Sequence, residues 1–132
     1  MKTLTPTREQ IRGLKGHEDD GPVVMINLLK FKTVTDGGES GRDAYNRYLT
    51  AVGPMLNNVG GHLLWMGAVN QVFIGKPHDD WDMVMLVEYP SRRAFLQMIS
   101  DPAYTKVHMH REEALADSAL LATTAIAGGI KK

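Results

Sequence analysis

Apolar residues along the chain fall into runs typical of strands and stripes typical of helices. Runs rich in Val, Leu, Ile and Met, bounded by Gly, Pro or Asp, predict strands. They lie at residues 22–31, 62–66, 71–75, 81–89 and 118–125. Helical spacing, helped by capping residues such as Thr5 and Ser91, predicts helices. These lie at about residues 6–15, 42–59, 92–99 and 102–116.

If the short runs at 62–66 and 71–75 count as one interrupted strand, and the helices at 92–99 and 102–116 as one helical segment, the order after the first helix is strand, helix, strand, strand, helix, strand. We expect each helix to connect neighbouring parallel strands by a right-handed crossover, with both helices on one face of a four-stranded sheet. The first strand, like the third, carries apolar residues on both of its sides. Helices that cover one face leave the other open, and a second copy of the chain is its simplest cover. The pattern therefore predicts an α+β homodimer joined through the open sheet face.

Composition narrows the class of protein. The 132 residues, 43% of them hydrophobic, suffice for one core. We expect an N-terminal helix and linker over 1–20, one domain over 21–125 and a flexible tail over 126–132. Lys plus Arg and Asp plus Glu number 15 each, which argues against nucleic acid or an anionic membrane as partner. With no cysteine, signal peptide or membrane span in the sequence, we expect a cytoplasmic protein.

A resemblance to a known family adds to this prediction. The segments that carry it are, in order, GPVVMINLLKF, GRDAYNRYLTAVGPML, GGHLLWMG, WDMVMLVEYPSRRAFLQMISDPAY and REEALADSAL. Over about residues 21–124 they resemble the dimeric α/β-barrel family known as a domain of unknown function, DUF 1330. The resemblance implies a ferredoxin-like β-α-β-β-α-β sheet that closes a barrel with a partner. The wider superfamily includes cofactor-free monooxygenases, lactone isomerases and haem-degrading enzymes, so the fold alone does not define a function.

Asn27 is a polar residue within the most apolar predicted strand. It alternates with Ile26 and Leu28, whose wholly apolar side suits a helix layer, so we expect Asn27 to face the barrel. A buried amide left without a partner costs about 1–3 kcal/mol. Either Asn27 is satisfied by a neighbouring group and is structural, or it orients a small ligand.

His62 opens the second strand and has the same parity as Met66. If the polar side again faces the barrel, His62 lies at the barrel mouth, where an imidazole could carry a proton near neutral pH. Asp82 and Glu88 are its candidate partners. A bulge near Gly67 would reverse the faces of the residues that follow it. We take His62 as the candidate catalytic residue, with a surface or hydrogen-bonded role as the alternative.

The last predicted helix carries Tyr104, His108 and Arg111 at positions i, i+4 and i+7 along one line. This polar stripe could present a phenol, an imidazole and a guanidinium to an anionic ligand. Alternatively, their stems cover the sheet and their tips reach water. His108 and His110 are two positions apart, on nearly opposite sides of the helix, so they cannot chelate one metal ion.

No recognisable catalytic, phosphate-binding or metal-binding motif occurs in the sequence, and we expect neither a metal nor a cofactor. Two functions remain open. One is a cofactor-independent enzyme acting on a small, largely apolar metabolite that carries a carbonyl or carboxylate group. The other is a non-catalytic homodimer that binds a small molecule or acts as an accessory protein. An enzyme needs a proton-transfer group within hydrogen-bond reach of its ligand, whereas a binding protein needs only a complementary shape.

Overall fold

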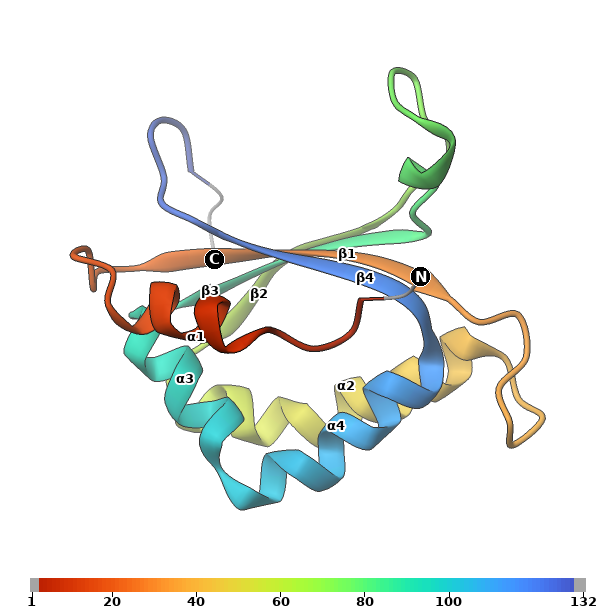
Figure 1. The fold of residues 1–132 in the computed structure, drawn as a ribbon, viewed down its shortest axis with the longest axis horizontal. Coiled ribbons are helices and arrows are strands. Elements are labelled where there is room, and N and C mark those ends of the chain that lie inside the picture. Colours follow the sequence, from red (N-terminus) through yellow and green to blue (C-terminus); the bar gives the residue numbers. More distant parts are fainter. Residues whose placement is uncertain (1–2, 130–132) are drawn as a thin grey trace.

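The computed structural model describes residues 3–129 of the chain. Four strands and four α-helices follow one another in the order of a ferredoxin-like fold, which confirms the predicted class (Figure 1). The elements are α1 (Arg8–Lys15), β1 (Val23–Phe31), α2 (Gly41–Asn58), β2 (His62–Ala68), the short 3₁₀ helix η1 (Pro77–Asp79), β3 (Met83–Tyr89), α3 (Arg92–Ser100), α4 (Pro102–Ala114) and β4 (Leu115–Thr123).

Side-chain caps fix where the helices begin. Thr7 caps α1 in a reciprocal box with Gln10, so this helix starts two residues later than the Thr5–Pro6 pair predicts. Ser91 caps α3, as predicted, and Asp101 caps α4 just before Pro102.

The predicted strand at 71–75 is wrong. These residues form part of a loop between β2 and β3, because β3 begins only at Met83. The segment that would have to pair with them contains Pro77 and acidic residues, and it forms a turn rather than a strand.

The sheet has the strand order β2-β3-β1-β4, and every neighbouring pair is antiparallel. The prediction that each helix links neighbouring parallel strands is therefore wrong in detail. β1 and β2 run in the same direction but are separated by β3, and β3 and β4 are separated by β1. This split arrangement still places the connecting helices on one side of the sheet.

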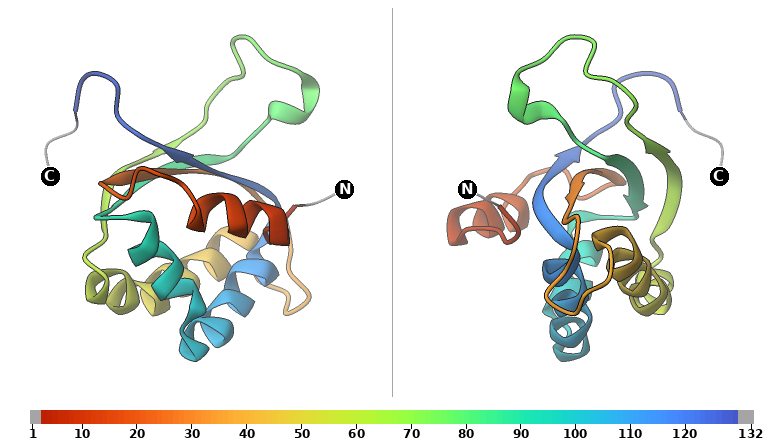
Figure 2. Two further views of the ribbon diagram at one scale, coloured as in Figure 1. Left: turned by 60° about the vertical axis from the view of Figure 1, so that its left-hand side comes forward. Right: turned by 90° about the vertical axis from the view of Figure 1, so that its right-hand side faces the viewer.

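One face of the sheet is covered by helices and the other is not. Helices α2, α3 and α4 lie on the same side of the sheet, and no α-helix lies over the opposite side in the described part of the chain (Figures 1 and 2). Near α3, the chain from Leu4 to Leu14 adds partly buried side chains to the core. We call the uncovered side the open face.

The two sides of β1 face in the directions opposite to those predicted from the sequence. Met25, Asn27 and Leu29 are buried in the core beneath the helices, whereas Ile26 and Leu28 are only partly buried on the open face. Asn27 therefore faces the helices and not the barrel side. The inference failed because both sides of the strand are apolar enough to be covered, so polarity alone did not select one.

The start of α2 lies close against the junction of β1 and β4. Gly41 donates its N–H to the Lys32 carbonyl at 2.9 Å, and the Lys32 N–H is donated to the Ala114 carbonyl, also at 2.9 Å. A Cβ atom on Gly41 would lie 2.5 Å from the Ala114 carbonyl oxygen and closer still to Lys32. Because these obstacles are backbone atoms, they cannot move aside as a side chain would.

We predict that Gly41→Ala lowers the free energy of unfolding by about 1–3 kcal/mol, since even one added methyl group overfills this junction. Gly13→Ala is the matched control, because a Cβ at this α1 position meets nothing within 4 Å. It should leave stability unchanged or raise it by up to about 1 kcal/mol. Urea unfolding of both variants measures the difference, and equal stabilities would contradict the assigned packing.

Candidate functional site

The helix side of the sheet is not completely filled. A cavity of about 260 Å³ lies between α2 and the strands. Its walls are largely apolar and include Val52 and Gly53 of α2 together with Met85 of β3. Few of the lining residues carry a polar group, namely one asparagine and three tyrosines. Such a mostly apolar hollow with a few polar groups is the usual form of a small-molecule site.

The amide belongs to Asn27, in the central strand β1. Its Nδ2 donates to the Met25 carbonyl at 3.3 Å, so the backbone partner proposed by the structural interpretation is present. Its Oδ1 has no hydrogen-bond partner among residues 3–129, and Asn27 lines the cavity. The structural and ligand-orienting interpretations are thus compatible, because the donor end is satisfied and the acceptor end is available.

The phenols come from Tyr45, Tyr48 and Tyr89. Tyr45 and Tyr48 are one turn apart on α2, with ring centroids 5.3 Å apart. Burial raises the pKa of Tyr45 to about 12, against the opposing effect of the Arg111 guanidinium. Burial also raises the pKa of Tyr48 well above its ordinary value, with smaller contributions from Tyr104 and Tyr45. Both phenols are therefore neutral near pH 7 and able to donate hydrogen bonds.

The three residues predicted on α4 do lie together, behind this wall. The Tyr104 hydroxyl is 3.0 Å from the Tyr48 hydroxyl, and the rings of Tyr104 and His108 are 5.6 Å apart. Arg111 is buried and donates from Nη1 to the Leu4 carbonyl at 3.1 Å. None of the three α4 residues lines the cavity. Their predicted contact with a ligand remains a prediction.

The two ring nitrogens of His108 lie in different environments. Its Nε2 is 3.0 Å from a Glu112 carboxylate oxygen, whereas its buried Nδ1 has no hydrogen-bond partner among the described residues. Burial lowers the pKa of His108; Glu112 opposes this shift and Arg111 adds to it. The imidazole is therefore mainly uncharged near neutral pH.

His62 lies on the open face, across the sheet from the cavity. It pairs with Glu88 on β3, and its Nε2 is 3.7 Å from the Glu88 carboxylate. Asn27 faces the other side, so the structure does not bring the predicted pair together. The bulge lies between Leu63 and Trp65, not at Gly67. It places Trp65 on the open face and Met66 against the cavity, the reverse of the predicted parity.

Asp82, the second partner considered for His62, has a different role. Its Oδ2 accepts a hydrogen bond from the Phe31 N–H at 2.8 Å, and its own N–H is donated to the Leu29 carbonyl. Asp82 therefore joins the start of β3 to the end of β1.

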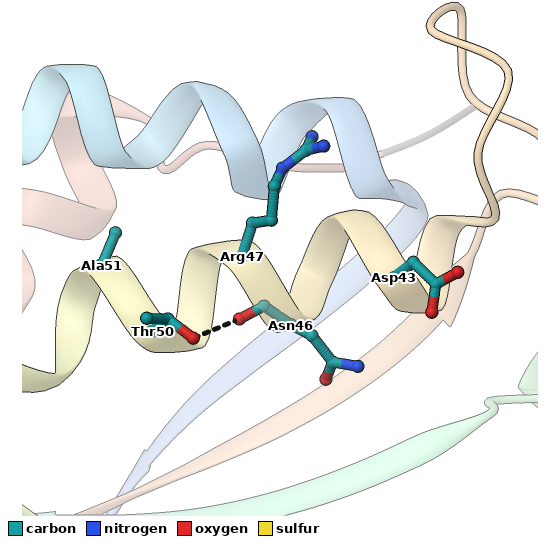
Figure 3. Close-up of a pocket in the computed structure, with 5 residues that line it drawn as sticks. All are labelled: Asp43, Asn46, Arg47, Thr50 and Ala51. Carbon is teal, nitrogen blue, oxygen red and sulfur yellow. Dashed lines mark hydrogen bonds between the residues drawn. The ribbon is translucent and has the colours of Figure 1, made fainter.

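A second depression, of about 340 Å³, lies on the outer side of α2 (Figure 3). The Thr50 hydroxyl in its wall donates to the Asn46 carbonyl of the same helix, at 3.1 Å. Arg47 forms ion pairs with Glu39 and Glu113. These exposed polar side chains are already paired and do not converge on a common point, so we take the cavity beside Asn27 as the candidate site.

No three His, Asp or Glu side chains within residues 3–129 are placed to hold a metal ion. In the same part of the chain, no helix has the length and apolar character needed to cross a membrane.

Sequence reasoning missed the phenols that form the site. Tyr45 and Tyr48 belong to the helically spaced apolar residues that predict α2, and both are buried in the structure. The available signal was that two phenols lie one turn apart in that stripe, and a buried hydroxyl needs a partner or a ligand. Gly53, which opens space in the same helix, was also missed.

The split β-α-β-β-α-β sheet with one open face defines a ferredoxin-like α+β protein. Within this class the chain belongs to the family described as Domain of unknown function (DUF1330), whose model matches residues 34–125. No protein of curated function matches the chain.

Solved structures support the same fold. The RPA0582 protein of unknown function from Rhodopseudomonas palustris is 31% identical, with a TM-score of 0.90 over 97% of this chain and 100% of that one. Hydroxynitrile lyase from Passiflora edulis is 11% identical, with a TM-score of 0.61 over 84% of this chain and 100% of the lyase. A dimeric ferredoxin-like protein of unknown function from Thermobifida fusca is 15% identical, with a TM-score of 0.52 over 83% and 96% of the two chains.

The buried phenols predict a loss of stability at high pH. An unfolded phenol ionises near pH 10, whereas burial raises the pKa of Tyr45 to about 12. Below about pH 10 its contribution is constant, and between about pH 10 and 12 the free energy of unfolding falls because the unfolded state loses the proton first. The share due to Tyr45 is on the order of 2 kcal/mol. Tyr45→Phe should remove it.

Urea unfolding of both proteins at pH 8 and at pH 11 measures this share. The Tyr45 hydroxyl has no hydrogen-bond partner of good geometry among the described residues, so Tyr45→Phe should itself cost little at pH 8. An equal loss of stability in both proteins between the two pH values would contradict the assigned burial.

Proposed function

We propose that this protein is a homodimer, joined through the open face, in which each subunit binds a small and largely apolar molecule that carries a carbonyl group. The observation that carries the binding proposal is the cavity on the helix side, with the free Asn27 acceptor and the Tyr45 and Tyr48 side chains in its wall. The proposal of a dimer rests on the open face.

The cavity limits the size of the ligand. Drug-sized ligands occupy sites of roughly 300–1,000 Å³. A volume of about 260 Å³ is smaller, and it suits a molecule with a single substituted ring or a short branched chain. Apolar walls favour such a molecule through the burial of its hydrocarbon surface.

The charge of the wall favours a carbonyl over a carboxylate. The neutral Tyr48 phenol can donate to a carbonyl oxygen, and Asn27 Oδ1 can accept from a hydroxyl or amide on the same ligand. A carboxylate would need a cation to offset its desolvation. Arg111 is the nearest candidate, but it lies behind Tyr45 and does not line the cavity.

The same groups favour binding over catalysis. Phenols whose pKa is raised by burial can polarise a carbonyl but are poor proton donors and cannot act as bases near pH 7. His108 is uncharged and could accept a proton, yet it does not line the cavity. We therefore place binding first.

A cofactor-independent enzyme is the second candidate, favoured by one contact. The 3.0 Å contact between the Tyr48 and Tyr104 hydroxyls could pass a proton away from the cavity. A relative of the same fold, from Passiflora edulis, is a hydroxynitrile lyase. The two candidates differ in turnover, because only an enzyme consumes its ligand.

The open face supports the homodimer. Its central positions are apolar, with Ile26 beside Leu86, and Trp65 and Leu121 at its borders are about half exposed. A continuous apolar sheet face of this kind is normally covered in water. The Thermobifida fusca relative is described as dimeric. Because the cavity lies on the opposite side of the sheet, a second copy on the open face leaves it available to a ligand.

We predict that Gly53→Leu weakens ligand binding without loss of fold. A Cβ at Gly53 meets nothing within 4 Å and points into open space at the cavity wall, so a leucine there should fill the cavity. Acetophenone serves as the carbonyl probe and benzoate as its charged counterpart, with binding followed by ligand-detected NMR. We expect acetophenone to bind more tightly, and Gly53→Leu to weaken that binding by about tenfold or more.

Gly13→Leu is the matched control, since its Cβ also meets nothing within 4 Å but lies on α1, away from the cavity. It should bind acetophenone as the unmodified protein does. Failure of acetophenone to bind the unmodified protein, or equal binding by Gly53→Leu, would refute the proposed site.

We predict that Leu86→Lys separates the dimer into folded monomers, because a charge at the centre of the open face would have to be desolvated in the interface. Met109→Lys is the control, on a residue that is exposed on α4 in the helix layer. Sedimentation equilibrium should show two chains for the unmodified protein and the control, and one chain for Leu86→Lys. A dimer that survives Leu86→Lys would exclude the open face as the interface.

A further inference from the structure

The loop between β2 and β3 is an arm that carries apolar residues into solvent. We call residues 69–80 the β2–β3 arm. Phe73 is 86% exposed and Ile74 is 89% exposed, side by side at its tip, while Val72 beside them is 37% exposed. Single exposed apolar residues are ordinary, but an adjacent pair on a projecting segment is typical of an interaction site.

The arm is held by specific contacts at its base. The Val69 N–H is donated to the Asp82 carbonyl at 2.9 Å, which continues the β2–β3 pairing beyond the strands. On the other side, the Lys30 ammonium is 2.6 Å from an Asp80 carboxylate oxygen. Near the tip, the Lys76 N–H is donated to the Asp79 carboxylate at 2.9 Å, at the start of η1. The apolar tip is therefore presented on an ordered support, which lowers the entropy cost of binding.

The direction of the arm identifies its partner. The arm projects from the end of the sheet on the side away from α2, α3 and α4, and so stands beside the open face (Figures 1 and 2). A molecule seated on the open face lies within its reach, and the proposed function places a second copy there. A twofold-related copy would be flanked by this arm and would extend its own arm in return.

The size of the open face shows why such a contact is needed. A stable interface engages roughly 20–30 residues on each side. The outward positions of the four strands are fewer than this, and central ones such as Ile26 and Leu86 are already partly covered by their neighbours. The nearly fully exposed Phe73 and Ile74 offer more apolar surface to a partner than these central residues do.

We propose that the β2–β3 arm clasps the second copy of the chain, with Phe73 and Ile74 packed against the partner subunit. This inference rests on the homodimer of the proposed function and adds to it a specific contact outside the sheet. It is independent of the identity of the ligand.

The absence of cysteine from the sequence allows a direct test. Phe73→Cys is labelled with a benzophenone maleimide, mixed with unlabelled chains grown in ¹⁵N, and irradiated. Peptide mass spectrometry then separates links within one chain from links between chains. Met109→Cys, which is 66% exposed in wild type on α4, is labelled in the same way as the control. We expect links between chains from position 73 and none from position 109.

A second variant measures the strength of the contact. Phe73→Ser with Ile74→Ser should raise the dimer dissociation constant by about tenfold or more, as expected when an apolar anchor is removed from both symmetric arms. Val34→Ser with Met109→Ser, which removes two other exposed apolar side chains, should leave it unchanged.

The outcomes separate this inference from the proposed function. Links between chains from position 73, with a weakened dimer in the double variant, support the clasp. A dimer that gives no such link and keeps its affinity in the double variant overturns the clasp and leaves the homodimer intact. A single chain in sedimentation of the unmodified protein overturns both.

Discussion

The structure depends on a four-stranded sheet whose two faces are both apolar, while its helices cover only one. On β1 this places Met25 and Leu29 in the core and leaves Ile26 and Leu28 on the open face. A sheet of this kind cannot be completed within one chain of this topology, because both long connections pass on the same side. The candidate site depends on the covered face, and the proposed homodimer depends on the open face.

The helix-covered face explains the candidate site. Aromatic side chains of α2 pack against the sheet without filling the space beneath them, and Gly53 leaves that space open. Tyr48 belongs to the wall and also contacts Tyr104 on α4, so the wall is joined to a buried polar cluster. The cavity thus results from packing large, rigid rings on the sheet, and the Asn27 amide places a polar group at one point of its wall.

The spacing of apolar residues was sufficient to predict the helices and strands, but not to predict which side of each strand faces the helices. Strands, helices and their order along the chain could be predicted because apolar spacing and caps are local, and the resemblance supplied the ferredoxin-like class. The side on which Asn27 lies depends on which face the helices cover, and neither side of β1 is polar enough to show this. The bulge before Trp65 has no glycine or proline to mark it, so the parity of Met66 was misread. The cavity could not be predicted because it arises where α2, α3 and three strands meet, and this depends on the tertiary packing.

The exposure of Trp65 tests most directly whether a second copy covers the open face. Trp65 is 50% exposed in the single chain, at the border of that face. In Trp81→Phe it is the only tryptophan, since the chain contains two. We predict that acrylamide quenches its fluorescence weakly at concentrations where two chains associate, and more strongly in the same protein carrying Leu86→Lys. Strong and equal quenching in both proteins at every concentration would contradict the account.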